Sequence, residues 1–268
     1  DDILYETEKM FEEIKMNSEK NNIDMSNVIN KLFEGDCLEY MKKIPDGSVD
    51  MILCDLPYGV TDCRWDSVLP FDKLWKQYER IIKDDGAIVL TAIQPFTTAL
   101  IQSNRKLFRY CWYWHKNCPT GFANAKKQPM RCIEDIVVFY KKPPIYNPQG
   151  LIRLDEPVHH KGSKKCGEVY SHGLESDFVT EYRNYPRNLL SVKCERGLHP
   201  TQKPTALFEY LIRTYTNEGA LVLDNCMGSG TTAVACIRSN RDFIGFEMDA
   251  KHFDTTQKRI ESELAQKK

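Results

Sequence analysis

The fold of this chain follows from residues 220–233, which read ALVLDNCMGSGTTA. This stretch predicts a short apolar strand over 220–224, a glycine turn, and a helix over 230–238. Gly228 and Gly230 allow the backbone to turn tightly and approach a ligand, and the first N–H groups of the helix are free to bind it. Such an order of elements is typical of a nucleotide-like cofactor site in an α/β sheet.

A second strand is expected over 242–247 and ends at Glu247. An acid at this spacing after a glycine turn can bind the two hydroxyls of a ribose. The turn also fits the relaxed dinucleotide pattern GxGxxA, so an NAD-dependent oxidoreductase is one alternative. The lysine of a P-loop is missing, which excludes a nucleoside triphosphate site of that type. The residues favour a nucleoside-containing cofactor.

The tetrapeptide Asp55-Leu56-Pro57-Tyr58 directly follows an apolar run over 49–54. In an open α/β sheet, the carboxyl end of a strand faces the ligand crevice. There the acid and a backbone carbonyl can each accept a hydrogen bond from an NH2 group, while the aromatic ring stacks on its heterocycle. The tetrapeptide therefore predicts a site for a planar amine, which an NAD-dependent oxidoreductase would leave unexplained.

Three motifs together resemble a known family. They are DLPY at 55–58, HPTQKP at 199–204 and DNCMGSGTT at 224–232. In this order they resemble the β-group (permuted) amino-methylating DNA methyltransferases, in which the catalytic box precedes the cofactor motifs. The resemblance implies a Rossmann-like doubly wound, mostly parallel α/β sheet of the class I S-adenosylmethionine-dependent methyltransferase type. Leu56 departs from the proline of many members, and Asn225 and Cys226 depart from their Pro-Phe.

The resemblance also implies an activity, namely site-specific methyl transfer from S-adenosylmethionine to N6 of an adenine flipped out of duplex DNA. Members whose box begins with Asp usually modify adenine, and cytosine N4 is the alternative. The implied catalytic residues are Asp55, Leu56, Pro57 and Tyr58. An RNA or protein amide acceptor and a non-catalytic DNA-binding subunit are further alternatives.

The resemblance implies a cofactor site built from separate segments of the chain. It places Lys203 near the methionine carboxylate, Glu247 at the ribose, and Asp36 near the adenine of the cofactor. Asp36 is equally suited to cap the following helix. The complete set is Asp36, Cys37, Lys203, Asp224, Asn225, Cys226, Gly228, Ser229, Gly230, Thr231 and Glu247. No metal site is expected.

Positive charge is concentrated in residues 101–150, which contain nine bases and two acids, although the net charge of the chain is only −1. Aromatic residues are interleaved with these bases. Such a segment favours a nucleic-acid interface, with a solvated surface as the alternative. The DNA-binding candidates are Lys116, Lys126, Lys127 and Arg131.

Alternating strands and helices predict one α/β domain with an added lobe. Strands are expected at 31–34, 49–54, 86–91, 108–114, 133–140, 220–224 and 242–247, and helices at 4–20, 36–43, 71–83, 95–105, 204–217, 230–238 and 250–264. Strands 108–114 and 133–140 suit an antiparallel edge pair. We expect four parts: an N-terminal helical extension at 1–30, a catalytic half at 31–140, an irregular target-recognition lobe at 141–198, and a cofactor-binding half at 199–268. The loop that follows Tyr58 is expected to close over a bound base.

Composition limits the setting of the protein. No apolar run approaches the roughly twenty residues of a membrane span, and no secretory leader opens the chain. Ten dispersed cysteines without a CxxC pair favour reduced thiols over disulfides or zinc. We therefore expect a cytoplasmic protein of a prokaryote or phage that acts on double-stranded DNA, with no membrane partner. A homodimer and a cognate restriction endonuclease are left open.

Overall fold

The computed structural model describes residues 25–59, 67–162, 176–195 and 202–267. The chain divides into a larger unit, Asp1–Asn147 with Asn188–Lys268, and a smaller unit, Pro148–Arg187. The helix expected over 4–20, most of the loop after Tyr58, and residues 199–201 of the HPTQKP motif lie outside the described residues.

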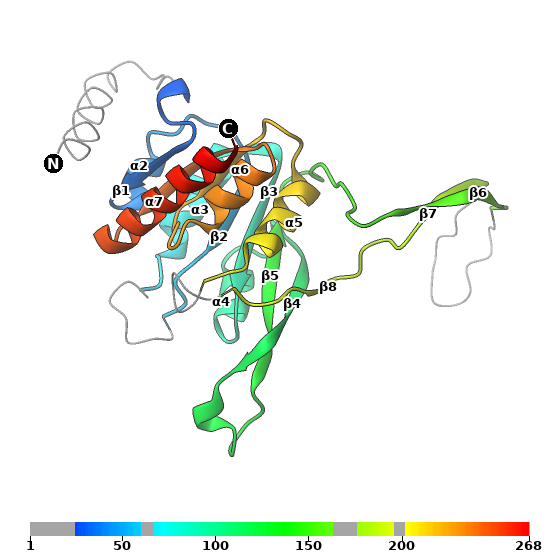
Figure 1. Cartoon of the computed structure of the whole chain (residues 1–268), viewed down its shortest axis with the longest axis horizontal. Helices are drawn as coiled ribbons and strands as arrows, with labels where there is room; N and C mark the ends of the chain where they lie inside the picture. The colour runs from blue at the N-terminus through cyan, green and yellow to red at the C-terminus, as the bar shows by residue number, and fades with distance from the viewer. Residues whose placement is uncertain (1–24, 60–66, 163–175, 196–201, 268) are drawn as a thin grey trace. The chain divides into compact units, whose positions relative to one another are not determined.

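An eight-stranded sheet organises the larger unit, in the order β1-β10-β9-β2-β3-β5-β4-β8 (Figure 1). Its strands are β1 (Lys31–Glu34), β2 (Val49–Asp55), β3 (Ile82–Ala92), β4 (Phe108–Thr120), β5 (Arg131–Phe139), β8 (Leu189–Ser191), β9 (Leu221–Asp224) and β10 (Asp242–Glu247). The strands from β1 to β3 in this order pair in parallel, and β5 is antiparallel to both β3 and β4. The predicted mostly parallel sheet and the antiparallel pairing of β4 with β5 are confirmed, but the pair is not at the edge, because β8 pairs with β4 on its outer side.

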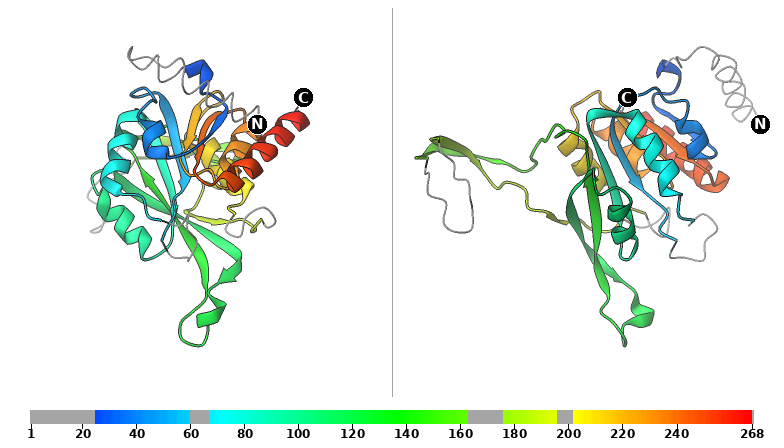
Figure 2. Two further views of the ribbon diagram at one scale, coloured as in Figure 1. Left: turned by 90° about the vertical axis from the view of Figure 1, so that its left-hand side faces the viewer. Right: turned by 180° about the vertical axis from the view of Figure 1, so that it is seen from behind.

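Helices cover both faces of this sheet (Figure 2). One layer holds α2 (Cys37–Met41), α3 (Phe71–Ile81) and α4 (Phe96–Ser103), and the other holds α5 (Thr205–Tyr215), α6 (Thr231–Arg238) and α7 (Ala250–Lys267). Along β2, Ile52 and Cys54 pack in the first core, while Met51 and Leu53 pack in the second. A strand buried on both faces has to be apolar throughout, which explains the run before the DLPY motif.

Strand boundaries differ from the prediction where polar residues enter the sheet. The strand expected over 86–91 begins at Ile82, which pairs with Val49 of β2; after an irregular stretch that holds the polar residues, the pairing with β2 resumes at Ala87. The strand expected over 108–114 continues to Thr120 and forms a long hairpin with β5, whose connection contains the 3-10 helix η2 (Phe122–Asn124). β8 was not predicted, because three residues between a proline-containing segment and a polar one show no periodicity.

The smaller unit contains a two-stranded antiparallel ribbon of β6 (Ile152–His160) and β7 (Phe178–Arg183). The rings of His160 and Phe178 stack with their centroids 4.6 Å apart. The lobe predicted at 141–198 is therefore partly regular, and its last residues, including β8, belong to the sheet of the larger unit.

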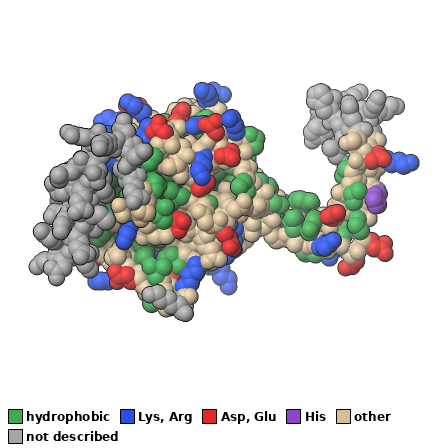
Figure 3. All heavy atoms as spheres, turned by 90° about the horizontal axis from the view of Figure 1, so that it is seen from above, with side chains coloured by type: hydrophobic (Ala, Val, Ile, Leu, Met, Phe, Trp, Pro, Cys, Tyr) green, Lys and Arg blue, Asp and Glu red, His purple; other side chains and the backbone are tan. Residues whose placement is uncertain are grey.

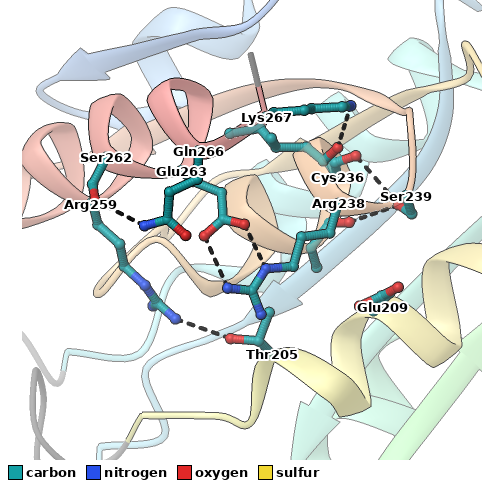
Figure 4. Close-up of polar contacts among 12 residues, drawn as sticks. Thr205, Glu209, Cys236, Arg238, Ser239, Arg259, Ser262, Glu263, Gln266 and Lys267 are labelled. Carbon is teal, nitrogen blue, oxygen red and sulfur yellow. Dashed lines mark hydrogen bonds and ion pairs between the residues drawn. The ribbon is translucent and has the colours of Figure 1, made fainter.

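Polar side chains fasten α7 to α6 and to the start of α5 (Figure 4). Arg238 of α6 donates two hydrogen bonds to Glu263 of α7, at 2.6 and 2.9 Å. Arg259 of α7 donates to the Ser229 carbonyl at 2.8 Å and to the Thr205 hydroxyl at 2.9 Å. The glycine turn is thus held from outside by a helix near the C-terminus. The 3-10 helix η1 (Met25–Asn27) precedes β1 at the other end of the described chain.

The described helices include none that is long and apolar enough to span a bilayer. On the face seen in Figure 3, acidic and basic side chains are intermingled, which fits the small net charge.

Replacing Tyr215 by Phe tests the join between α5 and β4. The Tyr215 hydroxyl accepts a hydrogen bond from the Trp112 indole at 2.6 Å, and Trp112 is 3% exposed. Without an acceptor, the buried N–H should cost about 1–3 kcal/mol of unfolding free energy, measured by urea denaturation. Tyr210→Phe on the same helix is the control, because its hydroxyl has no hydrogen bond among the described residues. Equal stability of Tyr215→Phe and wild type would contradict this role.

Candidate active site

The carboxyl ends of four neighbouring parallel strands meet at one edge of the sheet. Asp55 ends β2, Asp224 ends β9, Glu247 ends β10, and Asp36 follows β1 by two residues. The pairing of Met51 with Val222 and of Ile52 with Leu223 fixes the register between β2 and β9. The DLPY box and the glycine turn are therefore adjacent in space, although about 170 residues separate them in the sequence.

A cavity of about 580 Å³ opens at this edge. Every residue predicted for catalysis or for cofactor binding lines it, with the exception of Gly230. This volume lies in the usual range of small-molecule sites, roughly 300–1,000 Å³. One cavity thus contains both the predicted amine site and the predicted cofactor site.

Three side chains hold the Asp55 carboxylate. Oδ1 accepts hydrogen bonds from the hydroxyl of Tyr58, at 2.6 Å, and from the hydroxyl of Thr91 at the end of β3. Oδ2 accepts one from the Lys203 amine, also at 2.6 Å. Because the three donors come from different segments, the plane of the carboxylate is fixed before any substrate binds.

The Lys203 side chain is 6% exposed and lines the cavity. Its amine contacts Asp55 Oδ2 on one side and Glu134 Oε2, at 3.5 Å, on the other. Its predicted place near the methionine carboxylate stays a prediction. Burial disfavours its charge, but the combined attraction of Asp55 and Glu134 is larger and raises the pKa of Lys203. Lys203 is therefore an ammonium bound to the Asp55 carboxylate.

The glycine turn before α6 is shaped by Glu247. Its Oε2 accepts the Gly228 N–H at 2.7 Å and its Oε1 accepts the Asp249 N–H at 2.9 Å. Burial raises the pKa of Glu247, against these hydrogen bonds. Gly230 has φ +79°, and a Cβ there would lie 2.8 Å from Cγ2 of Thr256. Each carboxylate oxygen of Glu247 retains acceptor capacity toward the cavity, which fits a ribose diol.

Asp224 is buried at the start of the same turn and is 2% exposed. It accepts hydrogen bonds from the Thr232 hydroxyl and, at 3.0 Å, from the Cys226 N–H. Burial nevertheless raises its pKa to about 6. Asp224 ties the strand to the first turn of α6 and so shapes the cofactor side of the cavity.

Asn225 and Cys226 also line the cavity. The Asn225 side-chain oxygen accepts a hydrogen bond from Tyr78, and its nitrogen lies 3.6 Å from the Cys37 sulfur and 3.5 Å from the Cys226 sulfur. These contacts give Asn225 a structural role in the place where many family members carry Pro-Phe. Asp36 caps α2 through the Leu38 N–H at 2.8 Å and also lines the cavity, so both interpretations of Asp36 are compatible.

The basic candidates divide into two groups. Lys126, Lys127 and Arg131 are exposed on the β4–β5 hairpin, and Arg131 also borders the cavity. Lys116 is 6% exposed, and its amine is bound to Glu134 Oε1 at 2.8 Å. The prediction of Lys116 as a surface DNA contact is therefore corrected, because its charge is already neutralised inside the site.

Comparison with known proteins assigns the family. A profile described as DNA methylase, for N6 and N4 enzymes, matches residues 49–258. The chain belongs to this family. It is therefore an S-adenosylmethionine-dependent DNA methyltransferase, as the motifs predicted. Among the described residues, no group of three or more His, Cys, Asp or Glu could hold a metal ion.

Several relatives are similar over most of their length. The Type II methyltransferase M1.MboII of Moraxella bovis is 28% identical over 256 residues, which covers 84% of this chain and 94% of that protein. The DNA adenine methyltransferase YhdJ of Escherichia coli (strain K12) is 28% identical over 262 residues, covering 86% and 82%. The M1.HpyAVI-SAM complex has a TM-score of 0.59 at 24% identity, covering 85% of this chain and 98% of that one. This last likeness confirms the fold.

Two residues of the site were missed by sequence reasoning. Thr91 ends a predicted strand and Glu134 lies near the start of another, but neither belongs to a motif. Their positions beside Asp55 and Lys203 follow from the strand order β2-β3-β5, which the sequence does not specify. A polar residue at the carboxyl end of a strand next to β2 was the one available signal for Thr91.

The raised pKa of Asp224 predicts a pH-dependent stability. Its folded pKa lies above the ordinary 3.8, so the folded state keeps a proton that the unfolded state releases, and stability falls as pH rises through this window. Asp224→Asn removes this dependence. The difference in unfolding free energy between variant and wild type should change by about 2 kcal/mol between about pH 4.5 and 7.5, in favour of the variant at high pH. A constant difference in cofactor-free urea titrations would refute it.

Proposed function

We propose that this methyltransferase modifies N6 of an adenine that is rotated out of duplex DNA. The observation that supports this most is the Asp55 carboxylate, fixed by three donors at the edge of the cavity and one strand away from the cofactor turn. The first residue of the box is an acid, as is usual for the adenine enzymes that it resembles, and one of the relatives is a DNA adenine methyltransferase.

The exocyclic amine needs this carboxylate because its lone pair is delocalised into the ring. Asp55 Oδ2 and the Leu56 carbonyl would each accept one N–H and direct the lone pair at the incoming methyl carbon. Positive charge then develops on the nitrogen, and the adjacent carboxylate stabilises it in the transition state. The proton that the product releases can pass to Asp55. Pro57 fixes the backbone that follows the Leu56 carbonyl.

Tyr58 would have two tasks. Its hydroxyl orients Asp55, and its ring lies at the cavity, supported by Phe96 with the ring centroids 5.1 Å apart. Stacking of a base on such a ring is worth about 1–3 kcal/mol, which offsets part of the cost of extruding the base.

S-adenosylmethionine would supply the methyl group from its sulfonium. Glu247 is suited to its ribose hydroxyls, Asp36 to its adenine, and Asp224 with the turn over 228–231 to its methionine part. These residues would hold the donor at the ends of β9 and β10, so that neighbouring strands would bring nucleophile and methyl carbon together.

DNA would bind along the β4–β5 hairpin. Lys126, Lys127 and Arg131 are exposed there, and the sequence 121–131 contains no acid. Arg131 borders the cavity, which supports a contact between its positive charge and a phosphate next to the flipped nucleotide. We assign recognition of the DNA sequence to the smaller unit, Pro148–Arg187.

Several relatives are Type II methyltransferases, and we propose the same setting for this chain. That setting is the bacterial cytoplasm, with a cognate restriction endonuclease acting on the same DNA. A homodimer is the further proposed assembly, which light scattering of the purified protein tests. Sequencing that detects modified bases in a genome expressing the chain would give the recognised sequence.

The proposed catalytic role predicts that Asp55→Ala lowers methyl transfer at least about 100-fold, because the variant no longer stabilises the charge that develops in the transition state. Cofactor affinity by calorimetry should stay within a few-fold. Asp50→Ala, at the other end of β2, is the control and should keep the activity once its folding is verified. Mass spectrometry of nucleosides from the methylated DNA should find N6-methyladenine. Finding only N4-methylcytosine would show that the substrate assignment is wrong.

The proposed DNA interface predicts a reduced salt dependence. Lys126→Gln with Lys127→Gln should decrease the slope of log K against log salt by up to about 0.9 for each phosphate that is no longer neutralised. Lys251→Gln with Lys258→Gln on α7 removes the same charge as a control and should keep the wild-type slope. Identical slopes for both double variants would place the hairpin off the interface.

A further inference from the structure

The carboxylate of Asp55 has little acceptor capacity left. An ionised carboxylate offers about four acceptor positions. On Oδ1, two are taken by the hydroxyls of Tyr58 and Thr91, and on Oδ2 one is taken by the Lys203 ammonium. The acceptor that remains for a substrate amine is therefore on Oδ2, directly beside Lys203.

The ammonium of Lys203 has donor capacity left. It carries three N–H groups. Asp55 Oδ2 at 2.6 Å accepts one of them, Glu134 Oε2 lies at an ion-pair distance of 3.5 Å, and the centroid of the Tyr58 ring lies 5.5 Å from Nζ. The described residues provide no further hydrogen-bond acceptor. Lys203 is 6% exposed and lines the cavity. A buried N–H of a charged group is costly to leave unpaired, so this donor favours a ligand acceptor.

We propose that Asp55 Oδ2 and Lys203 Nζ form one acceptor–donor pair that reads the edge of the target base. Oδ2 accepts the exocyclic N–H, and Nζ donates to the ring nitrogen next to the amine-bearing carbon. In adenine this ring nitrogen is N1. The inference rests on the proposed function, because it requires a target base with an exocyclic amine.

The same pair would reject bases of the opposite pattern. Guanine and thymine present a carbonyl next to a ring N–H on this edge. Their carbonyl would face the Asp55 carboxylate, and their N–H would face the ammonium, so both contacts become repulsive. Buried polar mismatches of this kind are a strong source of specificity. Lys203 is thus a specificity residue, whereas the amine acceptor Asp55 serves both specificity and chemistry.

Glu134 and Lys116 act as positioning residues for the pair formed by Asp55 Oδ2 and Lys203 Nζ. Glu134 Oε2 is buried and has no hydrogen-bond partner among the described residues. Its contact with Lys203 is an ion pair at 3.5 Å. Glu134 Oε1 is neutralised by Lys116 at 2.8 Å. The ammonium is thus hydrogen-bonded to Asp55 at 2.6 Å and lies within ion-pair distance of Glu134, which fixes its position beside Oδ2. The charges of Asp55, Lys203, Glu134 and Lys116 alternate in sign and cancel, which makes their joint burial tolerable.

Binding of the methionine carboxylate is the competing role for Lys203. The main chain of Lys203 does belong to the cofactor side, since its carbonyl accepts the Thr231 hydroxyl at 3.2 Å. Its amine, however, extends to Asp55 and not to the glycine turn. The two roles differ in what a variant loses, which makes them separable by experiment.

The test is a double-substitution cycle in which Lys203 is replaced in the enzyme and the ring nitrogen is replaced in the target base, singly and together. Duplexes carry the recognised sequence with either adenine or 1-deazaadenine, which lacks N1 but keeps the amine, at the target position. For wild type, the deaza substitution should lower kcat/KM about 10- to 100-fold more than it does for Lys203→Met, because the variant has no donor to lose. The intrinsic reactivity change of the deaza base cancels in this comparison. Lys251→Met on α7, an exposed lysine outside the cavity and the proposed DNA interface, is the control and should keep the wild-type sensitivity.

Each other outcome has a defined meaning. Equal sensitivity of wild type and Lys203→Met overturns the proposal, and a large rise in the dissociation constant of S-adenosylmethionine alongside it assigns the amine to the methionine carboxylate. If Lys203→Met does not fold, Glu134→Gln serves instead and should show an intermediate sensitivity, while full wild-type sensitivity overturns the proposal. If the enzyme methylates cytosine, the adenine assignment fails, and the same cycle with 3-deazacytosine tests the pair.

Discussion

The parallel pairing of β2 with β9 is the constraint on which the site depends. These strands are short and apolar on both faces, so burial in the two cores fixes their order and register. Their carboxyl ends carry Asp55 and Asp224, which we propose to serve the target amine and the methyl donor, respectively. A shift of one residue in this pairing would turn every side chain of β2 to the opposite core and remove Asp55 from the cavity.

Sequence reasoning was most successful for motifs that need both particular side-chain chemistry and a particular backbone geometry. The glycine turn and Glu247 were found because few other residues can build them, and the structure brings them into one cavity with the DLPY box. Thr91, Glu134 and the amine position of Lys203 were not found, because they depend on which strands are neighbours. Lys116 was misassigned for the same reason, since a lysine in a strand gives no sign that a carboxylate on the neighbouring strand neutralises it.

The alternating charges of Asp55, Lys203, Glu134 and Lys116 orient one another, but their burial is unfavourable in free energy. Removing Lys203, Glu134 and Lys116 from water is unfavourable, and their mutual attraction offsets this only while all of them are present. Because water is largely excluded around these buried groups, a polar contact with the substrate would be stronger there than in water. Such a cluster explains why the carboxylate of Asp55 can be oriented in advance, with one acceptor left for the reaction.

The smaller unit is attached to the fold at two anchored positions. Asn147 before it donates its backbone N–H to the Thr214 carbonyl near the end of α5, and Asn188 after it accepts one from Tyr113 of β4. The strands between these anchors lie outside the eight-stranded sheet. If the smaller unit reads the DNA sequence, as we propose, an exchange of this insertion between the two anchors would change which genomic sites are marked and would leave the strands that carry Asp55 and Asp224 in place.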